Sequence, residues 1–192
     1  MGAKLDKVCV IDVEATCWQT PEEQGDQPNE VIEIGICLLE LKTGSILDAA
    51  GYVVKPRFTK VSPFCTELTG WTQEQIDAGQ DIEDTLKCIT ADYNISRHHI
   101  WFSCGEYDRI KLGSEGAASL GGLYGIKRDV NPFASMRAHV NIKTLFAMKH
   151  KLPREMGMAR MLGYIGEPLE GRHHNGKDDA VNIAKIVRNV LS

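Results

Sequence analysis

The sequence predicts an α/β fold in which α-helices cover a mixed β-sheet. Strand-like segments come first along the chain, then strand-like and helix-like segments alternate, and helices dominate the C-terminal half. The composition, with 43% hydrophobic and 25% charged residues, is that of a soluble globular protein and excludes a disordered, collagen-like or coiled-coil chain. At roughly 150 residues per domain, we expect residues 1–192 to form a single domain.

Four segments are predicted to be strands. Residues 8–13 form a continuous apolar run rich in β-branched side chains, as expected of a central strand that is buried on both faces. Residues 31–41 and 45–54 flank a short turn at 42–44, which predicts an antiparallel meander beside the first strand. The apolar residues 100–103 are the fourth strand.

Helices are predicted for most of the remaining chain. Thr72 precedes one of them, because Thr72 and Gln75 have the spacing of a capping box. The predicted helical segments are residues 62–70, a short helix after Thr72, 82–93, a helix from about Glu106, 144–149, 154–162 and 178–191. The glycine-rich residues 113–135 receive no assignment.

The charge balance limits how the chain would hold a polyanion. It has 22 Lys and Arg against 26 Asp and Glu, a net charge of −4, so it lacks the overall basic field of a protein that coats nucleic acid. A polyanionic substrate would need local basic patches or metal ions. Lys143, Lys149, Lys151 and Arg154 are candidates for a phosphate-contacting patch, with a solvated charged face as the alternative.

The cysteines and the N-terminus predict a cytoplasmic protein without membrane association. None of the six cysteines forms a C-x-x-C pair, which favours small buried side chains in a reducing compartment over disulfides or zinc ligation. Residues 1–7 lack the apolar stretch of a signal peptide, and no run approaches the roughly 18 apolar residues of a membrane span.

Two carboxylates interrupt the apolar pattern at the end of the first predicted strand. Asp12 and Glu14 are two residues apart, so their side chains share one face of the strand, about 7 Å apart. A divalent cation would relieve both their repulsion and their lost hydration. The alternative is a strand end that frays into a solvated loop.

Two other acidic residues also occupy unusual positions. Asp108 follows the fourth strand and a glycine turn, in the first turn of a helix, where helix capping is the alternative explanation. Asp179 lies on the apolar stripe of the last helix, so it needs a partner such as a metal ion. The adjacent His173 and His174 would be a surface pair or part of a zinc site, but no cysteine or further histidine has the spacing of zinc ligands.

The three acidic segments, taken together, resemble the motifs of the DEDDh 3′-to-5′ exonucleases of the DnaQ-like superfamily. The D-x-E of Asp12 and Glu14 resembles the first motif, and Asp108 after an aromatic residue resembles the second. His174, five residues before Asp179, resembles the third. His173 stands where relatives often carry another residue, and the five-residue spacing favours His174.

The surrounding residues are most similar to the branch that contains the enhanced-RNAi and histone-mRNA 3′ exonucleases. The segments that carry this similarity are residues 12–18, 33–35, 64–70 and 171–179. The similarity spans roughly residues 8–191, so the motif-bearing core is about residues 7–191, with 113–140 divergent.

The resemblance implies an RNase H-like mixed sheet of about five strands flanked by α-helices. It also implies phosphodiester hydrolysis with two divalent ions, Mg²⁺ or Mn²⁺, about 3.5–4 Å apart. The metal ligands in this pattern are Asp12, Glu14, Asp108 and Asp179, with Asp12 as the bridge between the ions. These four residues and His174, which would accept the proton of the attacking water, make up the catalytic set.

Substrate contacts are expected from residues next to these motifs. The candidates are Ala15, Thr16, Cys17, Leu68, Thr69 and Tyr107. The backbone of residues 15–17 and the Thr16 hydroxyl would meet the terminal sugar. By the resemblance, Leu68 and Thr69 would face the last base, although helix packing is the alternative for Leu68. Tyr107, where some relatives carry Trp, would stack on that base.

The sequence therefore predicts a 3′-to-5′ exonuclease that releases nucleoside 5′-monophosphates. Its expected substrate is nucleic acid with a free 3′-hydroxyl end, with single-stranded RNA or short overhangs favoured over DNA. The alternatives are a DNA-directed exonuclease of the same superfamily, a catalytically silent nucleic-acid-binding module, and a structural protein with solvated acidic residues. All five catalytic-type residues are present, which argues against the silent module.

Overall fold

A five-stranded mixed sheet forms the centre of the computed structural model, which describes residues 5–135 and 137–192. The strands are β1 (Lys7–Ala15), β2 (Val31–Glu40), β3 (Ile46–Val53), β4 (Trp101–Ser103) and β5 (His139–Asn141). They lie in the order β3-β2-β1-β4-β5, in which β1, β2 and β3 pair antiparallel and β1, β4 and β5 pair parallel. The predicted fold class and the predicted meander are confirmed.

Strand β5 is not among the segments predicted from the sequence. β5 has only three residues, too few for an alternating pattern, and it exists because its backbone pairs with β4, with His139 opposite Trp101. Its first and last residues are the polar His139 and Asn141. A strand of this kind is produced by tertiary pairing rather than by its own sequence.

Helices account for most of the remaining chain. They are α1 (Pro21–Gln24), α2 (Pro63–Thr69), α3 (Gln73–Asp77), α4 (Ile82–Tyr93), α5 (Tyr107–Leu112), α6 (Leu120–Tyr124), α7 (Ile142–Lys149), α8 (Met158–Ile165) and α9 (Gly176–Leu191). The predicted capping box is confirmed, because Thr72 and Gln75 exchange side-chain-to-backbone hydrogen bonds at the start of α3. The predicted start of α8 at residue 154 is wrong. The helix begins at Met158, which is also the first of its residues buried in the core.

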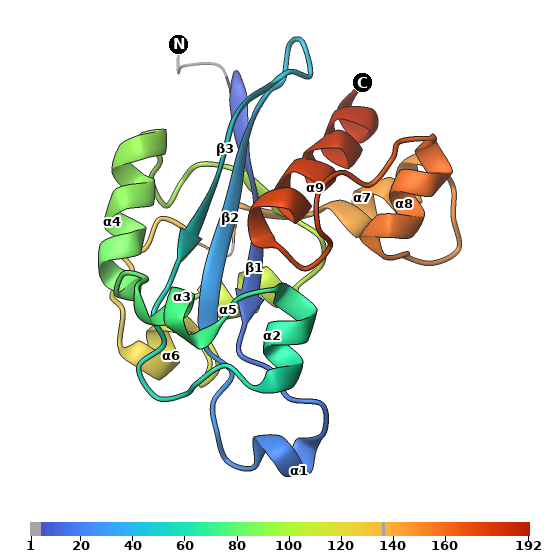
Figure 1. The fold of residues 1–192 in the computed structure, drawn as a ribbon. Helices are drawn as coiled ribbons and strands as arrows, with labels where there is room; N and C mark the ends of the chain where they lie inside the picture. The colour runs from blue at the N-terminus through green and yellow to red at the C-terminus, as the bar shows by residue number, and fades with distance from the viewer. Residues whose placement is uncertain (1–4, 136) are drawn as a thin grey trace.

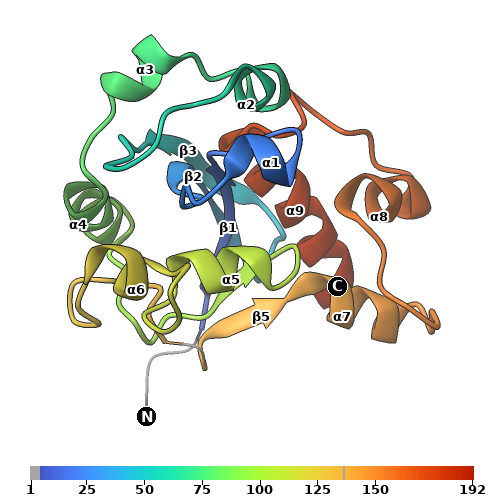
Figure 2. The same cartoon turned by 90° about the horizontal axis from the view of Figure 1, so that it is seen from below.

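The helices cover both faces of the sheet (Figures 1 and 2). α7, α8 and α9 lie on one side, and α4 and α6 on the other. Cys9, Ile11 and Val13 of β1 pack into the core beneath α4, whereas Val8 and Val10 pack against α9. β1 is therefore buried on both faces, which explains its continuous apolar sequence.

The cysteines take no part in covalent cross-links. All six are free. Cys9, Cys37 and Cys65 are buried, as predicted, whereas Cys17, Cys88 and Cys104 are only partly buried. In the described ranges, no helix combines the length and the apolar character needed to cross a bilayer.

Candidate active site

A pocket of about 350 Å³ lies where β1 and β4 end, between α5 and the start of α9. Its lining residues are Asp12, Val13, Glu14, Ala15, Cys17, Leu68, Cys104, Tyr107, Asp108, Lys143, Met158, His173, His174 and Asp179. The four carboxylates and the histidine that the motifs singled out therefore share one cavity, although they come from three distant parts of the chain.

Asp12 and Glu14 reach the pocket from β1. They follow Val8 and Val10 in the alternation of that strand, so they point to the same side as α9. Glu14 is only 8% exposed. Burial, followed by the negative charges of Asp179 and Glu33, raises the pKa of Glu14 to about 8. The solvated strand end considered from the sequence is thus excluded.

Asp108 reaches the same pocket from the first turn of α5. Its side chain is 4% exposed, and its Oδ1 accepts a hydrogen bond from the backbone N–H of Val13 at 2.9 Å. This bond holds the start of α5 against the end of β1. Burial raises the pKa of Asp108 to about 6.

Asp179 lies in the first turn of α9, on its buried side. Its Oδ2 accepts a hydrogen bond from the backbone N–H of His174 at 2.9 Å. Its Oδ1 is buried and has no hydrogen-bond partner within the part of the chain that the structure describes. Burial raises the pKa of Asp179 to about 6. An oxygen in this state needs a ligand from outside the chain or a proton.

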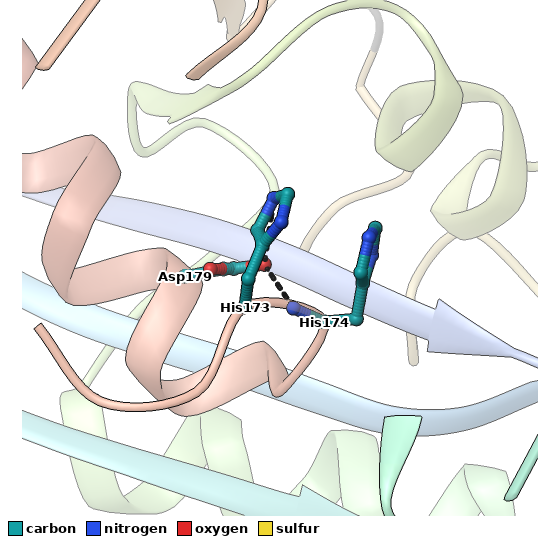
Figure 3. A group of neighbouring side chains, drawn as sticks. All are labelled: His173, His174 and Asp179. Carbon is teal, nitrogen blue, oxygen red and sulfur yellow. Dashed lines mark hydrogen bonds and ion pairs between the residues drawn. The ribbon is translucent and has the colours of Figure 1, made fainter. Parts of the chain in front are cut away.

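The two histidines lie side by side above Asp179 (Figure 3). Their rings are stacked with centroids 4.0 Å apart at an interplanar angle of 29°. His173 Nε2 lies 3.9 Å from Oδ2 of Asp179. Burial, followed by the positive charges of His173 and Arg172, lowers the pKa of His174. The five-residue spacing drew attention to His174, but the structure brings both rings close to the carboxylate.

Glu33 is part of this site, although the sequence analysis gave it no role. It is 1% exposed and lies opposite Glu14 in the pairing of β1 with β2. Its carboxylate accepts hydrogen bonds from Trp71 Nε1 at 2.8 Å, from Gly176 N at 2.9 Å and from Lys177 N at 3.3 Å. It therefore holds the N-terminus of α9, the end that favours negative charge. A carboxylate within the otherwise apolar β2 was the available signal.

A pair of glycines allows α9 to come this close to the sheet. A Cβ on Gly35 would lie 1.9 Å from the carbonyl oxygen of Gly176. Gly35 is also opposite Asp12 in the β1–β2 register. Close backbone contact at this point places Asp179 beside Asp12 and Glu14.

Four of the six predicted substrate residues line the pocket: Ala15, Cys17, Leu68 and Tyr107. Tyr107 is 48% exposed, and its hydroxyl donates a hydrogen bond to Oδ1 of Asn29 at 2.8 Å. This bond holds the tyrosine ring in place at the mouth of the pocket.

Thr16 and Thr69, the other two predicted substrate residues, do not line the pocket, and their substrate contacts stay predictions. Thr16 is fully buried, its hydroxyl accepts a hydrogen bond from Glu30 N at 2.9 Å, and its own N–H donates to Glu30 O at 2.8 Å. Thr69 is 2% exposed, and its hydroxyl donates to Cys65 O at 2.8 Å. Thr16 thus joins the end of β1 to the segment before β2, whereas the Thr69 hydroxyl bonds within α2.

The proposed basic patch is divided by the structure. Lys143 lines the pocket, and its positive charge acts to lower the pKa of Asp108. Lys149 instead donates to backbone carbonyls at the C-terminal end of α9, including Ser192 O at 3.1 Å. Lys151 and Arg154 are exposed outside the pocket lining.

The carboxylates fit a divalent cation. Asp12, Glu14 and Asp179 each offer an oxygen, and these oxygens lie within 4.8 Å of one another. Burial, followed by the negative charges of Asp108 and Glu14, raises the pKa of Asp12 well above its usual range. A set of carboxylate oxygens suits hard cations such as Mg²⁺ and Mn²⁺, which would remove this repulsion. The partnerless Oδ1 of Asp179 supports the same conclusion.

Comparisons with known sequences point to nucleases. A model of the family RNase_T, described as exonuclease, matches residues 9–98. The protein named 3′-5′ exoribonuclease 1 of Homo sapiens is 31% identical over 196 residues, which cover 97% of this chain and 52% of the relative. The chain thus spans about half the length of the curated relatives that it matches first.

Solved structures agree with this assignment. The nuclease domain of 3′hExo, a DEDDh family member bound to rAMP, matches with a TM-score of 0.81 and 30% identity, covering 97% of this chain and 92% of that one. A structure on 3′-end specific recognition of histone mRNA stem-loop by 3′-exonuclease matches with a TM-score of 0.80 and 28% identity, covering 97% of this chain and 63% of that one.

Proposed function

The chain belongs to the DEDDh exonuclease family, and on that premise we propose that it is a 3′-to-5′ exonuclease that removes nucleoside 5′-monophosphates from RNA. One observation carries this proposal. Asp12, Glu14, Asp108, Asp179 and His174 line one cavity, and burial raises the pKa of the carboxylates there. Without a cation, the like charges of four buried carboxylates destabilise the fold.

The four carboxylates are proposed as the metal ligands. Held by these residues, two Mg²⁺ or Mn²⁺ ions would stabilise the attacking and leaving oxygens of the phosphodiester. After burial, the charges of Asp108 and Asp179 both raise the pKa of Asp12, so Asp12 lies near both carboxylates. This suits a residue that would bridge the two ions. Glu14 and Asp179 would complete one side, and Asp108 the other.

His174 is proposed as the general base. Because burial and the neighbouring positive groups lower its pKa, the ring is neutral at physiological pH. A neutral imidazole has a free nitrogen lone pair that can take the proton of the attacking water. The hydrogen bond from its backbone N–H to Asp179 keeps the residue beside the carboxylates.

The remaining lining residues would seat the last nucleotide. Leu68 and Tyr107 provide an apolar and an aromatic wall, and stacking of one base on an aromatic ring contributes about 1–3 kcal/mol. Ala15 and Cys17 offer backbone next to the metal ligands. Lys143 would contact a phosphate oxygen, which would offset the negative charge of the cavity.

RNA is favoured over DNA because of the relatives. The human relative is named an exoribonuclease, and the 3′hExo nuclease domain is described as bound to rAMP. The Thr16 hydroxyl, which was expected to read the sugar, accepts a hydrogen bond from Glu30 N, so we expect the backbone of residues 15–17 to contribute to any discrimination of the 2′-hydroxyl.

Labelled oligonucleotides test the proposal. Matched RNA and DNA strands, each labelled at the 3′ or the 5′ end, would be incubated with Mg²⁺, with Mn²⁺ and with EDTA. We expect release of single 5′-monophosphates from the 3′ end of RNA, slower attack on DNA, and no cleavage in EDTA. Equal cleavage in EDTA would contradict the metal assignment, and faster cleavage of DNA would contradict the RNA preference.

A further inference from the structure

Asp179 belongs to two ligand sets of different chemistry. One set is Asp12, Glu14 and Asp179, which offers only oxygens. The other is His173, His174 and Asp179, which offers two imidazole nitrogens and one oxygen, all within 4.8 Å of one another. Oxygen sets suit Mg²⁺ and Mn²⁺, whereas imidazole suits zinc and similar transition ions. The proposed nuclease function uses the first set and assigns no role to His173.

The second set has the dimensions of a zinc site that needs only a small closure. Donors at the usual Zn–N and Zn–O distances in a tetrahedron are about 3.4 Å apart. His173 Nε2 and Asp179 Oδ2 are 3.9 Å apart, so a movement of about half an ångström by the half-exposed His173 ring would suffice. Figure 3 shows both rings rising from the loop on the same side, next to the carboxylate.

The buried carboxylate of Asp179, which both ligand sets share, needs a ligand. Its side chain is 5% exposed, yet Oδ1 lacks any hydrogen-bond partner among the residues that the structure describes. Oδ2 lies 3.9 Å from His173 Nε2 and accepts a hydrogen bond from the His174 backbone N–H, so this oxygen faces the imidazole pair. A three-residue protein set of this kind leaves a fourth position for water, as zinc sites with an open coordination position do.

We propose that His173, His174 and Asp179 bind a zinc ion, and that this ion inhibits the exonuclease. The inhibition rests on the proposed function, whereas the binding does not. A zinc-bound imidazole has one nitrogen on the ion and the other on its proton, so His174 loses the lone pair that a general base needs. Asp179 is shared at the same time, which removes it from the oxygen set.

His173 decides whether this second set exists. Without it, the set falls to one imidazole and one carboxylate, while the oxygen set is unchanged. The side chain of His173 is 46% exposed, so a substitution there removes little core packing. The competing ligands around it are Asp12 and Glu14, which favour Mg²⁺ and Mn²⁺.

Cobalt spectroscopy and calorimetry test the binding directly. The full chain would be titrated with Co²⁺, which absorbs visible light in tetrahedral sites, and Zn²⁺ would then displace it. We expect one zinc-displaceable Co²⁺ with tetrahedral absorption in the unmodified protein. His173→Asn should weaken zinc binding by at least the ~10-fold that loss of even an outer partner costs. His98→Asn is the matched control, because His98 and His99 are also adjacent but exposed and, in the described chain, belong to no group of metal-ligand geometry.

Inhibition is measured as the ratio of cleavage rates with and without Zn²⁺ at saturating Mg²⁺. The unmodified protein and His98→Asn should both lose activity in micromolar zinc, and His173→Asn should resist it. Equal zinc affinity and equal inhibition in His173→Asn would overturn the proposal, because zinc would then occupy the oxygen set. Absence of tetrahedral Co²⁺ absorption would overturn it as well. Zinc binding that depends on His173 in a chain without nuclease activity would refute the proposed function and leave the site standing.

Discussion

The carboxylate of Glu33 accepts a hydrogen bond from the backbone N–H of Gly176 across 2.9 Å, and so joins β2 to the first residue of α9. This contact places Asp179, three residues further on, beside the carboxylates of β1. Glu33 adds negative charge beside a pocket that already holds four carboxylates, and after burial and Asp179 it is the next cause of the raised pKa of Glu14. Three donors stabilise the buried Glu33 carboxylate: Trp71 Nε1 and two backbone N–H groups.

Glu33→Ala should destabilise the fold and lower activity. Three donors would lose their acceptor in a buried place, and each buried unsatisfied group costs about 1–3 kcal/mol. We expect the free energy of unfolding, measured with urea in the presence of Mg²⁺, to fall by at least about 2 kcal/mol. This is the cost of roughly two such groups. Glu74→Ala, at an exposed position in α3, should stay within about 0.5 kcal/mol of the unmodified protein. An equal effect of the two variants would contradict the role of Glu33.

Asp12→Asn should abolish cleavage and stabilise the metal-free protein. The folded-state pKa of Asp12 is raised by burial and by Asp108, so its charge opposes folding. A carboxyl whose pKa is raised by folding stabilises the folded state at pH values below its unfolded-state pKa. This stabilisation is lost as the pH rises through the folded-state pKa. In EDTA, the gain of the variant over the unmodified protein should therefore grow from pH 5 to pH 8, reaching on the order of 1–3 kcal/mol.

Thermal unfolding in EDTA at several pH values measures this difference. Asp26→Asn is the control, because Asp26 is exposed in the loop before β2 and does not line the pocket. Saturating Mg²⁺ should reverse the order, since only the unmodified protein keeps the full ligand set. Cleavage by Asp12→Asn at the unmodified rate would refute the metal assignment.

His174→Ala should lose about 10²–10⁴-fold in the single-turnover rate, the usual effect of removing a general base. His173→Ala should lose much less, because the third motif assigns the proton transfer to His174. The comparison is made without zinc, in buffer treated with a chelating resin and resupplied with Mg²⁺. A larger loss for His173 would mean that the ring near Asp179 Oδ2 is the base.

Cleavage should require a free 3′-hydroxyl end. A pocket of about 350 Å³ that ends on carboxylates can seat the last nucleotide, but an extra 3′-phosphate would bring negative charge against them. A time course on linear, circular and 3′-phosphorylated RNA of one sequence measures this. We expect intact circles and strongly resistant 3′-phosphorylated strands. Cleavage of the circle that disappears with Asp12→Asn would show an endonuclease.

Much of the fold follows from local patterns in the sequence. The buried run of β1, the meander of β2 and β3, and helix α4 are visible because each repeats its apolar residues over many positions. β5 and α6 have three and five residues, which is too short for periodicity, so neighbouring elements decide them. The predicted start of α8 is four residues too early because Arg154 and Glu155, which precede the helix, are themselves good helix formers.

The sequence by itself singled out the residues that we propose carry the chemistry. Asp12, Glu14, Asp108 and Asp179 stand out because a charge at an apolar position is costly and therefore noticeable. Only the tertiary structure decided that Glu33 supports α9, that the Thr16 hydroxyl turns inward and that His173 reaches Asp179. These contacts join residues that are far apart in the chain, so no periodic sequence pattern reveals them. They form when the Gly35–Gly176 contact brings α9 onto the sheet.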